Sequence, residues 1–220
     1  MHDFNNGTID YKSEVMRKTI HLISLSIPII YCFIERHLAL KILVPITLLF
    51  LVIDIGRYYF PALNKIVINI FGFMLRDHEI DKTKKNLSGA TYVLLSAAIV
   101  VFFFPKEFAI TGFSILIISD ILAALVGRKF GRHKFLFKSL EGTLAFFISA
   151  CIVTLFTPKF EYNFAEYLIA FASAGVGAIF ENISYGWADD NLAIPVSIGI
   201  SLWILYYLFL PELSPQLILF

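Results

Sequence analysis

A carboxylate, Asp120, lies inside a strongly apolar segment and is followed by small residues at helical spacing. Ala123, Ala124, Gly127 and Gly131 lie three, four, seven and eleven residues after it, so a helix would place all five on one face. Ionised groups in membrane helices are costly and usually functional. We expect Asp120 to bind a metal just below the membrane surface, beside a smooth face for phosphates. The alternative is a helix-packing face in which Asp120 pairs with a nearby basic residue.

A basic loop follows this segment and ends in Lys-Ser-Leu-Glu-Gly-Thr, at the start of another apolar stretch. Free N–H groups at a helix start, with a lysine and hydroxyls nearby, favour phosphate. Gly142 would let the backbone approach a ligand closely. The expected nucleotide and phosphate contacts are Arg128, Lys129, Gly131, Arg132, Lys134, Lys138, Ser139, Glu141, Gly142 and Thr143. The alternatives are a loop whose charge only sets topology, and Ser139 or Thr143 as an ordinary helix cap.

Acidic and amide side chains gather in a third segment, with Glu181 and Asn182 followed by Asp189, Asp190 and Asn191. Oxygen ligands of this kind suit Mg²⁺, which carboxylates commonly share with substrate phosphates. We therefore expect Asp120, Asp189 and Asp190 as metal ligands. The alternative is a solvated acidic turn in which Asp190 or Asn191 caps the last helix.

A cationic group also precedes the first apolar stretch, where Arg17, Lys18 and His21 follow Glu14. Arg17 and His21 are four residues apart and share a helix face, and Glu14 can pair with Lys18. These cations could contact a substrate phosphate or lipid headgroup. They could equally anchor the helix at the membrane interface.

The composition is that of a membrane protein. Of the 220 residues, 58% are hydrophobic and 16% charged, whereas soluble domains have about 45–50% apolar and about 25% charged residues. Apolar stretches long or nearly long enough to cross the roughly 30 Å hydrocarbon core lie at 19–34, 38–55, 89–104, 108–126, 143–157, 165–180 and 192–210. We expect a single all-α domain over 1–220, an integral multi-pass membrane protein with about seven transmembrane helices.

Residues 61–75 are short for a span, and their apolar side chains follow the i, i+3, i+4 spacing of an amphipathic interfacial helix. With that segment outside the bilayer core, 14 of the 18 Lys and Arg residues lie on the side of the N-terminus. The positive-inside rule then predicts a cytoplasmic N-terminus and an external C-terminus. Every loop with candidate chemistry falls on the cytoplasmic side.

Five motifs together resemble the dolichol kinase, phytol kinase and CTP-dependent diacylglycerol kinase family. They are E-x-x-R-K-x-x-H at Glu14–His21, S-G-x-x-Y at Ser88–Tyr92, D-x-x-A-x-x-x-G-x-x-x-G at Asp120–Gly131, K-S-x-E-G-T at Lys138–Thr143, and Glu181 with D-D-N-x-x-x-P at Asp189–Pro195. The resemblance implies a lipid kinase that takes CTP as donor, Mg²⁺ as cofactor and a membrane lipid alcohol as acceptor. One departure is Ser119, where many relatives have glycine.

The resemblance and the residue chemistry together assign catalytic roles to Asp120, Lys138, Glu181 and Asp190, with Glu181 or Asp190 orienting or deprotonating the lipid hydroxyl. No nucleic-acid partner is expected. The sequence contains neither the G-x-x-x-x-G-K-[ST] loop of P-loop ATPases nor an H-E-x-x-H zinc motif.

Two other functions remain open at this stage. The central motifs also look like those of phosphatidate cytidylyltransferases, but the K-R-x-x-x-x-K-D and Gly-His-Gly-Gly patterns of those enzymes are absent. A small transporter would use its intramembrane carboxylates to couple to protons or cations. Such a transporter would label no lipid from a nucleotide.

Overall fold

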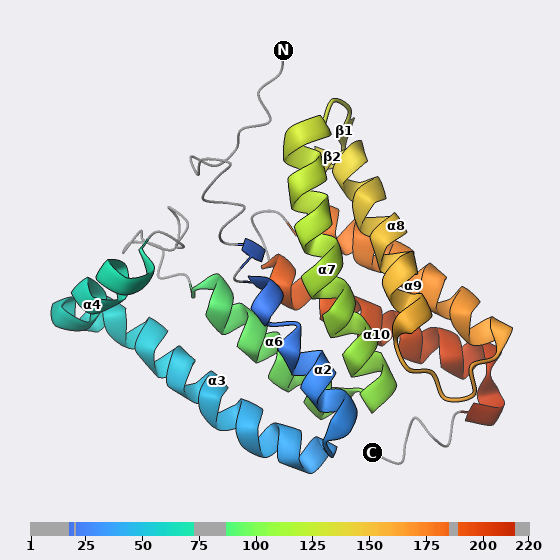
Figure 1. The fold of residues 1–220 in the computed structure, drawn as a ribbon, viewed down its shortest axis with the longest axis horizontal. Helices are drawn as coiled ribbons and strands as arrows, with labels where there is room; N and C mark the ends of the chain where they lie inside the picture. Colours follow the sequence, from blue (N-terminus) through green and yellow to red (C-terminus); the bar gives the residue numbers. More distant parts are fainter. Residues whose placement is uncertain (1–17, 20, 73–86, 185–188, 214–220) are drawn as a thin grey trace.

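The computed structural model describes residues 18–19, 21–72, 87–184 and 189–213, which form a bundle of apolar helices (Figure 1). The helices are α2 (Ser26–Phe33), α3 (Arg36–Tyr59), α4 (Pro61–Phe71), α6 (Gly89–Phe103), α7 (Lys106–Phe130), α8 (Leu140–Phe156), α9 (Phe164–Ile183) and α10 (Asp190–Phe209), followed by a 3₁₀ turn at Pro211–Leu213. Each predicted apolar stretch overlaps one of these helices, which confirms the all-α class. A short antiparallel hairpin, β1 (Lys134–Phe135) and β2 (Lys138–Ser139), was not expected.

Four helices, α3, α7, α9 and α10, are long and apolar enough to cross a membrane. The apolar helices at His21–Phe33, Gly89–Phe103 and Leu140–Phe156 are shorter. A turn at Ser24 and Leu25 separates the first helical residues from α2. The total of seven crossings therefore stays a prediction.

Helix α7 forms the centre of the bundle and packs against α2, α6, α8 and α10. Its most apolar 18-residue window is 67% buried, whereas that of α3 is 22% buried. Small residues allow this close packing, since a Cβ added at Gly112 would lie 3.1 Å from the carbonyl oxygen of Pro195 in α10. The carboxylate of Asp120 is thus carried by the most enclosed helix.

Helix α4 is separate from α3, as the amphipathic pattern of 61–75 predicts. Phe60 has an extended backbone (φ −116°, ψ 104°) and Pro61 occupies the first turn of α4, a position where proline costs no hydrogen bond. In Figure 1, α4 lies at the end of α3 that is remote from α2. The helix ends at Phe71, a few residues earlier than predicted.

A buried polar network joins the end of α3 to the start of α6. Asp54 Oδ2 accepts hydrogen bonds from Ser88 N (2.7 Å) and Thr91 Oγ1 (2.5 Å). Arg57 Nε lies 3.3 Å from Asp54 Oδ1, so these two side chains form an ion pair. Ser88 also caps α6. These contacts therefore hold the end of α3 and the start of α6 together.

At the opposite end of the bundle, buried charged side chains form hydrogen bonds with nearby backbone and side-chain groups. Glu166 is fully buried, and its carboxylate accepts hydrogen bonds from Phe160 N, Glu161 N, Asn163 N and Tyr206 Oη. Burial lowers the pKa of Lys159 to about 8, although Glu166 opposes the shift. The Lys159 amine caps the carbonyl groups of Thr154 and Thr157 at the end of α8. These contacts fix loop geometry.

The contact between α10 and Phe104 can be tested with two glycine substitutions. Each replaces a helical glycine by alanine, which alone favours the helix by about 1 kcal/mol. In Gly199→Ala the new Cβ would lie 2.7 Å from the ring of Phe104, whereas in Gly175→Ala the nearest atom is 3.7 Å away. Overpacking costs about 1–3 kcal/mol, so we expect Gly199→Ala to melt at lower temperature than the parent protein in detergent, and Gly175→Ala to melt at the same temperature or higher. Equal shifts would contradict this packing.

Candidate active site

Four candidate catalytic residues, far apart in the sequence, meet at one end of the bundle. Asp120 comes from α7, Lys138 from β2, Glu181 from α9 and Asp190 from the first turn of α10. The amine of Lys138 donates to Glu181 Oε1 (2.5 Å) and lies 3.8 Å from Asp190 Oδ2. The Asp120 carboxylate interacts electrostatically with Lys138 and Asp190. We call these four residues and Lys18 the charged cluster.

Lys18 is the direct partner of Asp120. Its amine donates to Asp120 Oδ2, and both side chains are almost completely buried. His21, one helical turn further on, also lies within electrostatic reach of Asp120. Pairing of Asp120 with a basic residue, one of the two outcomes open from the sequence, is confirmed. Arg17 lies outside the described residues.

The environment of Lys138 keeps this residue cationic. Burial by itself would lower the pKa of its amine, but the nearby carboxylates of Glu181, Asp190 and Asp120 raise that pKa above its usual value. The lysine therefore stays protonated at neutral pH. Lys18 and Lys138 together offset two of the three carboxylate charges, so the cluster can accommodate further positive charge.

One carboxylate oxygen of the cluster shows where that charge could lie. Glu181 Oε2 is buried and has no hydrogen-bond partner among the described residues. In the described part of the chain, no three His, Cys, Asp or Glu side chains form a complete metal cage. Mg²⁺ rarely needs one, because it commonly binds one or two carboxylates together with substrate phosphates. The donor set is compatible with Mg²⁺ bound in that way.

Asn182 positions Lys138. Its side-chain oxygen accepts hydrogen bonds from the backbone N–H groups of Phe137 (2.9 Å) and Lys138 (3.2 Å). Its amide nitrogen donates to Thr143 Oγ1 (2.7 Å). Asn182 is fully buried and fixes both the hairpin and the start of α8 to α9. The sequence places Asn182 in the oxygen-rich segment beside Glu181 but carries no signal for these contacts with the hairpin and α8.

The residues at the start of α8 cap and pack the helix. Ser139 Oγ accepts a hydrogen bond from Gly142 N (3.2 Å), which confirms Ser139 as the N-cap. A Cβ on Gly142 would lie 3.1 Å from the carbonyl oxygen of Ala123 and 3.2 Å from Gly127 Cα. Gly142 thus lets α8 approach α7, and the close approach of its backbone to a ligand stays a prediction. A phosphate role for Ser139 and Thr143 stays a prediction.

Glu141 holds the basic loop in a fixed shape. Its carboxylate accepts hydrogen bonds from the backbone N–H groups of Arg132 (3.1 Å) and His133 (3.2 Å), and lies 2.7 Å from His133 Nδ1. Of the predicted phosphate-binding cations, Lys138 lies at the carboxylates of Glu181 and Asp190. The others are exposed on the surface around the hairpin, namely Arg128, Lys129, Arg132 and Lys134. Gly131 ends α7 beside Ser139.

The N-cap of the last helix lies one residue before the two positions suggested from the sequence. Asp189 is the N-cap of α10, and its Oδ1 accepts hydrogen bonds from Asn191 N (3.0 Å) and Asn191 Nδ2 (2.7 Å). Asp190 and Asn191, either of which was the alternative cap, lie in the first helical turn instead. This arrangement turns the carboxylate of Asp190 toward Lys138.

The Lys18–Asp120 pair can be tested by its effect on stability. Removing one partner of a buried ion pair costs about 3–5 kcal/mol, because the other charge is left uncompensated. We expect Lys18→Met to lower the melting temperature strongly, and the double variant Lys18→Met with Asp120→Asn to recover much of the loss. Lys65→Met removes an exposed cation from α4 and serves as the control. If Lys18→Met melts like Lys65→Met, the pair does not stabilise the fold.

Comparison with known proteins finds relatives across most of the chain. An uncharacterized protein of Rickettsia prowazekii is 33% identical over 202 residues, which are 91% of this chain and 98% of that protein. CTP-dependent diacylglycerol kinase 1 of Schizosaccharomyces pombe is 30% identical over 156 residues, 65% of this chain and 70% of that kinase. Phytol kinase of Synechocystis is 34% identical over 113 residues, 47% of this chain and 46% of that kinase.

No family model matches the chain. No solved structure matches it either. The two named relatives are lipid kinases, and the match to the yeast enzyme covers more than two thirds of that protein. The chain therefore belongs to the lipid-kinase family that contains CTP-dependent diacylglycerol kinase 1 and phytol kinase.

Proposed function

We propose that this protein is a CTP-dependent kinase that phosphorylates the hydroxyl group of a membrane lipid alcohol at the cytoplasmic face. The acceptor classes compatible with its relatives are a polyprenol or dolichol, a phytol-type isoprenoid alcohol, and diacylglycerol. The main support is the convergence of Asp120, Lys138, Glu181 and Asp190 in one buried cluster. Such a cluster costs free energy in an apolar bundle. It differs from the opposite end of the bundle, where the buried charged side chains hydrogen-bond to the neighbouring loops.

The donor approaches from the side of the hairpin. The exposed cations Arg128, Lys129, Arg132 and Lys134 attract the triphosphate, since a surface of one charge sign raises the local concentration of the opposite charge. Lys138, at the inner end of this cationic surface, contacts the transferred phosphate. The named CTP dependence of the yeast relative supports CTP as the donor.

The reaction is an in-line displacement at the γ-phosphorus. The oxygen of the lipid hydroxyl forms a bond to this phosphorus while the bond to the β–γ bridging oxygen breaks, and CDP leaves. The hydroxyl proton passes to the carboxylate of Glu181 or Asp190. Lys138 stays protonated and stabilises negative charge on the transferred group. Positioning and charge stabilisation supply most of the catalysis in phosphoryl transfer.

Asp120 and either Asp189 or Asp190 would hold Mg²⁺ together with the phosphates. Mg²⁺ held by these residues would neutralise negative charge on the phosphates. The unsatisfied oxygen of Glu181 is the observation that best fits an additional cation in this cluster. Lys18 and His21 lie close to Asp120 and would bind the headgroup end of the acceptor.

The position of the radioactive label distinguishes the proposed reaction from its alternatives. Protein purified in detergent is incubated with Mg²⁺, a lipid alcohol, and CTP labelled on either the α- or the γ-phosphorus. We expect label in the lipid from γ-labelled CTP only, and none after removal of the divalent ion with EDTA. Transfer of the α-label would indicate a cytidylyltransferase. No lipid label from CTP, ATP or UTP with any of the alcohols would contradict a kinase.

Two substitutions test the cluster. Asp120→Asn and Lys138→Ala each remove one charge, and we expect transfer from CTP to fall by about 100-fold or more, as for the loss of a direct transition-state contact. Glu35→Gln and Lys65→Ala change the same charges at exposed positions and serve as matched controls. Membrane insertion and detergent melting are measured for all four variants. Full activity of both cluster variants would overturn the site assignment.

A further inference from the structure

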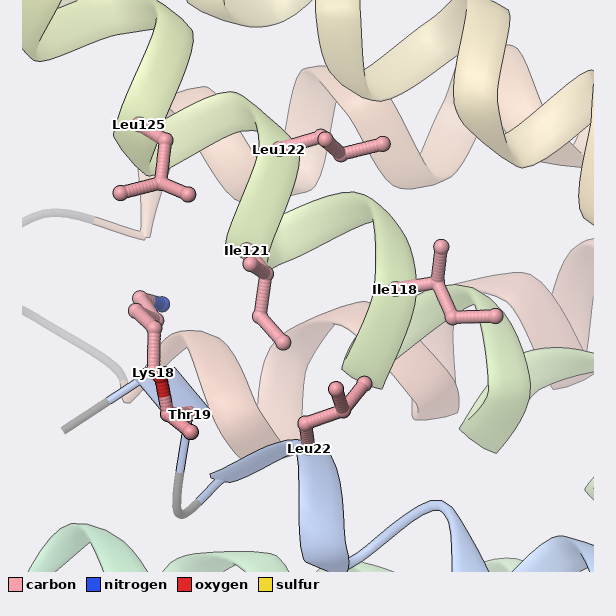
Figure 2. A pocket seen from close by; sticks show the side chains of 7 residues that line it. All are labelled: Lys18, Thr19, Leu22, Ile118, Ile121, Leu122 and Leu125. Carbon is pink, nitrogen blue, oxygen red and sulfur yellow. The ribbon is translucent and has the colours of Figure 1, made fainter. Parts of the chain in front are cut away.

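Two apolar cavities lie along α7. The first has a volume of about 250 Å³ and is enclosed by the segment before α2 and the second half of α7, with Lys18 at its polar edge. Figure 2 shows Ile118, Ile121, Leu122 and Leu125 of α7 around this cavity, with Lys18, Thr19 and Leu22 opposite. The second cavity, of about 440 Å³, lies between α2, α7 and α8.

The two cavities adjoin each other along α7, since Ile118 and Leu122 line both of them. The lining positions on α7 extend from Ile110 to Leu125, which corresponds to about 22 Å at 1.5 Å per residue. This length is most of the roughly 30 Å thickness of the hydrocarbon core. We call the two adjoining cavities together the chain groove.

The ends of the chain groove differ in chemistry. At one end Lys18 lines the groove and also pairs with Asp120, the residue directly before the groove-lining Ile121. From there the lining is almost entirely apolar as far as Thr157 and Pro158. A molecule that fits this space has a polar group at one end and a long hydrocarbon chain. One end of the chain groove is therefore lined by Lys18, a member of the charged cluster.

We propose that the chain groove binds one hydrocarbon chain of the lipid acceptor, with the acceptor hydroxyl held at the Lys18–Asp120 end. The proposal rests on the proposed function and deepens it, because it predicts how the enzyme distinguishes acceptors. A short alcohol fills only the first cavity. A longer alcohol also reaches the second cavity and gains binding energy there.

Neighbouring residues on α8 provide a matched pair of variants. Ile152 lines the second cavity and is 53% exposed, whereas Ile148, one helical turn earlier, is 58% exposed and does not line it. Tryptophan at either position can be accommodated without filling a tightly packed core. Ile152→Trp should obstruct the far half of the chain groove, and Ile148→Trp should leave it open.

The first measurement is KM for the short alcohol geraniol, the longer geranylgeraniol, and CTP. We expect Ile152→Trp to raise KM for geranylgeraniol by about tenfold, an effect typical of a filled hydrophobic subsite, while KM for geraniol and CTP is unchanged. Ile121→Trp, in the first cavity, should raise KM for both alcohols. Ile148→Trp should behave as the parent protein. If Ile152→Trp and Ile148→Trp give the same KM for geranylgeraniol, the proposal is overturned while the kinase function stands.

A second measurement needs no turnover. A geranylgeraniol analogue with a diazirine at the end of its chain is photolysed with the protein, and the labelled peptides are mapped. We expect labelling of α2 and α8 at the second cavity, competed by unlabelled geranylgeraniol and reduced in Ile152→Trp. Labelling without competition would show that bulk lipid fills the groove and would falsify the proposal. If unlabelled geranylgeraniol competes with the labelling but the protein phosphorylates no alcohol, the chain groove binds the lipid and the proposed reaction is wrong.

Discussion

Compensation of charge in an apolar environment is the constraint on which this structure depends. Asp120 is buried in the central helix, and Lys18, 102 residues away in the sequence, supplies its counter-ion. Lys138 does the same for Glu181. Each pair is stabilising only while both partners are present, since an isolated buried charge costs several kcal/mol. The two pairs therefore tie the segment before α2, the hairpin, α7 and α9 into one unit.

Close backbone approach and one amide complete that unit. Gly127 and Gly142 allow α7 and α8 to touch, and Ser139 fills the remaining space between them with its hydroxyl group. Asn182 then connects α9 to the hairpin and to Thr143. Every one of these contacts lies at the end of the bundle that holds the charged cluster. The apolar remainder of the helices provides the chain groove.

The sequence predicted the features that depend on local pattern. Helix positions follow from apolar periodicity, and the Ser139 cap follows from its place before a helix. The hairpin could not be predicted, because its turn lacks the usual Gly or Asn and places Leu136 at φ 51°. Contacts with residues distant in the sequence hold the hairpin in this conformation. Pairing of Lys18 with Asp120 likewise has no local signal.

The adjacency of Glu181 and Asn182 has a mechanical consequence. The Glu181 side chain binds the amine of Lys138, and the Asn182 side chain accepts a hydrogen bond from the backbone N–H of the same lysine. A single turn of α9 therefore contacts both the backbone and the end of the side chain of Lys138. Transmembrane helices tilt to match bilayers of different thickness. When α9 tilts, Glu181 and Lys138 move together with the helix. The distance between the carboxylate and the amine therefore does not change with the thickness of the bilayer.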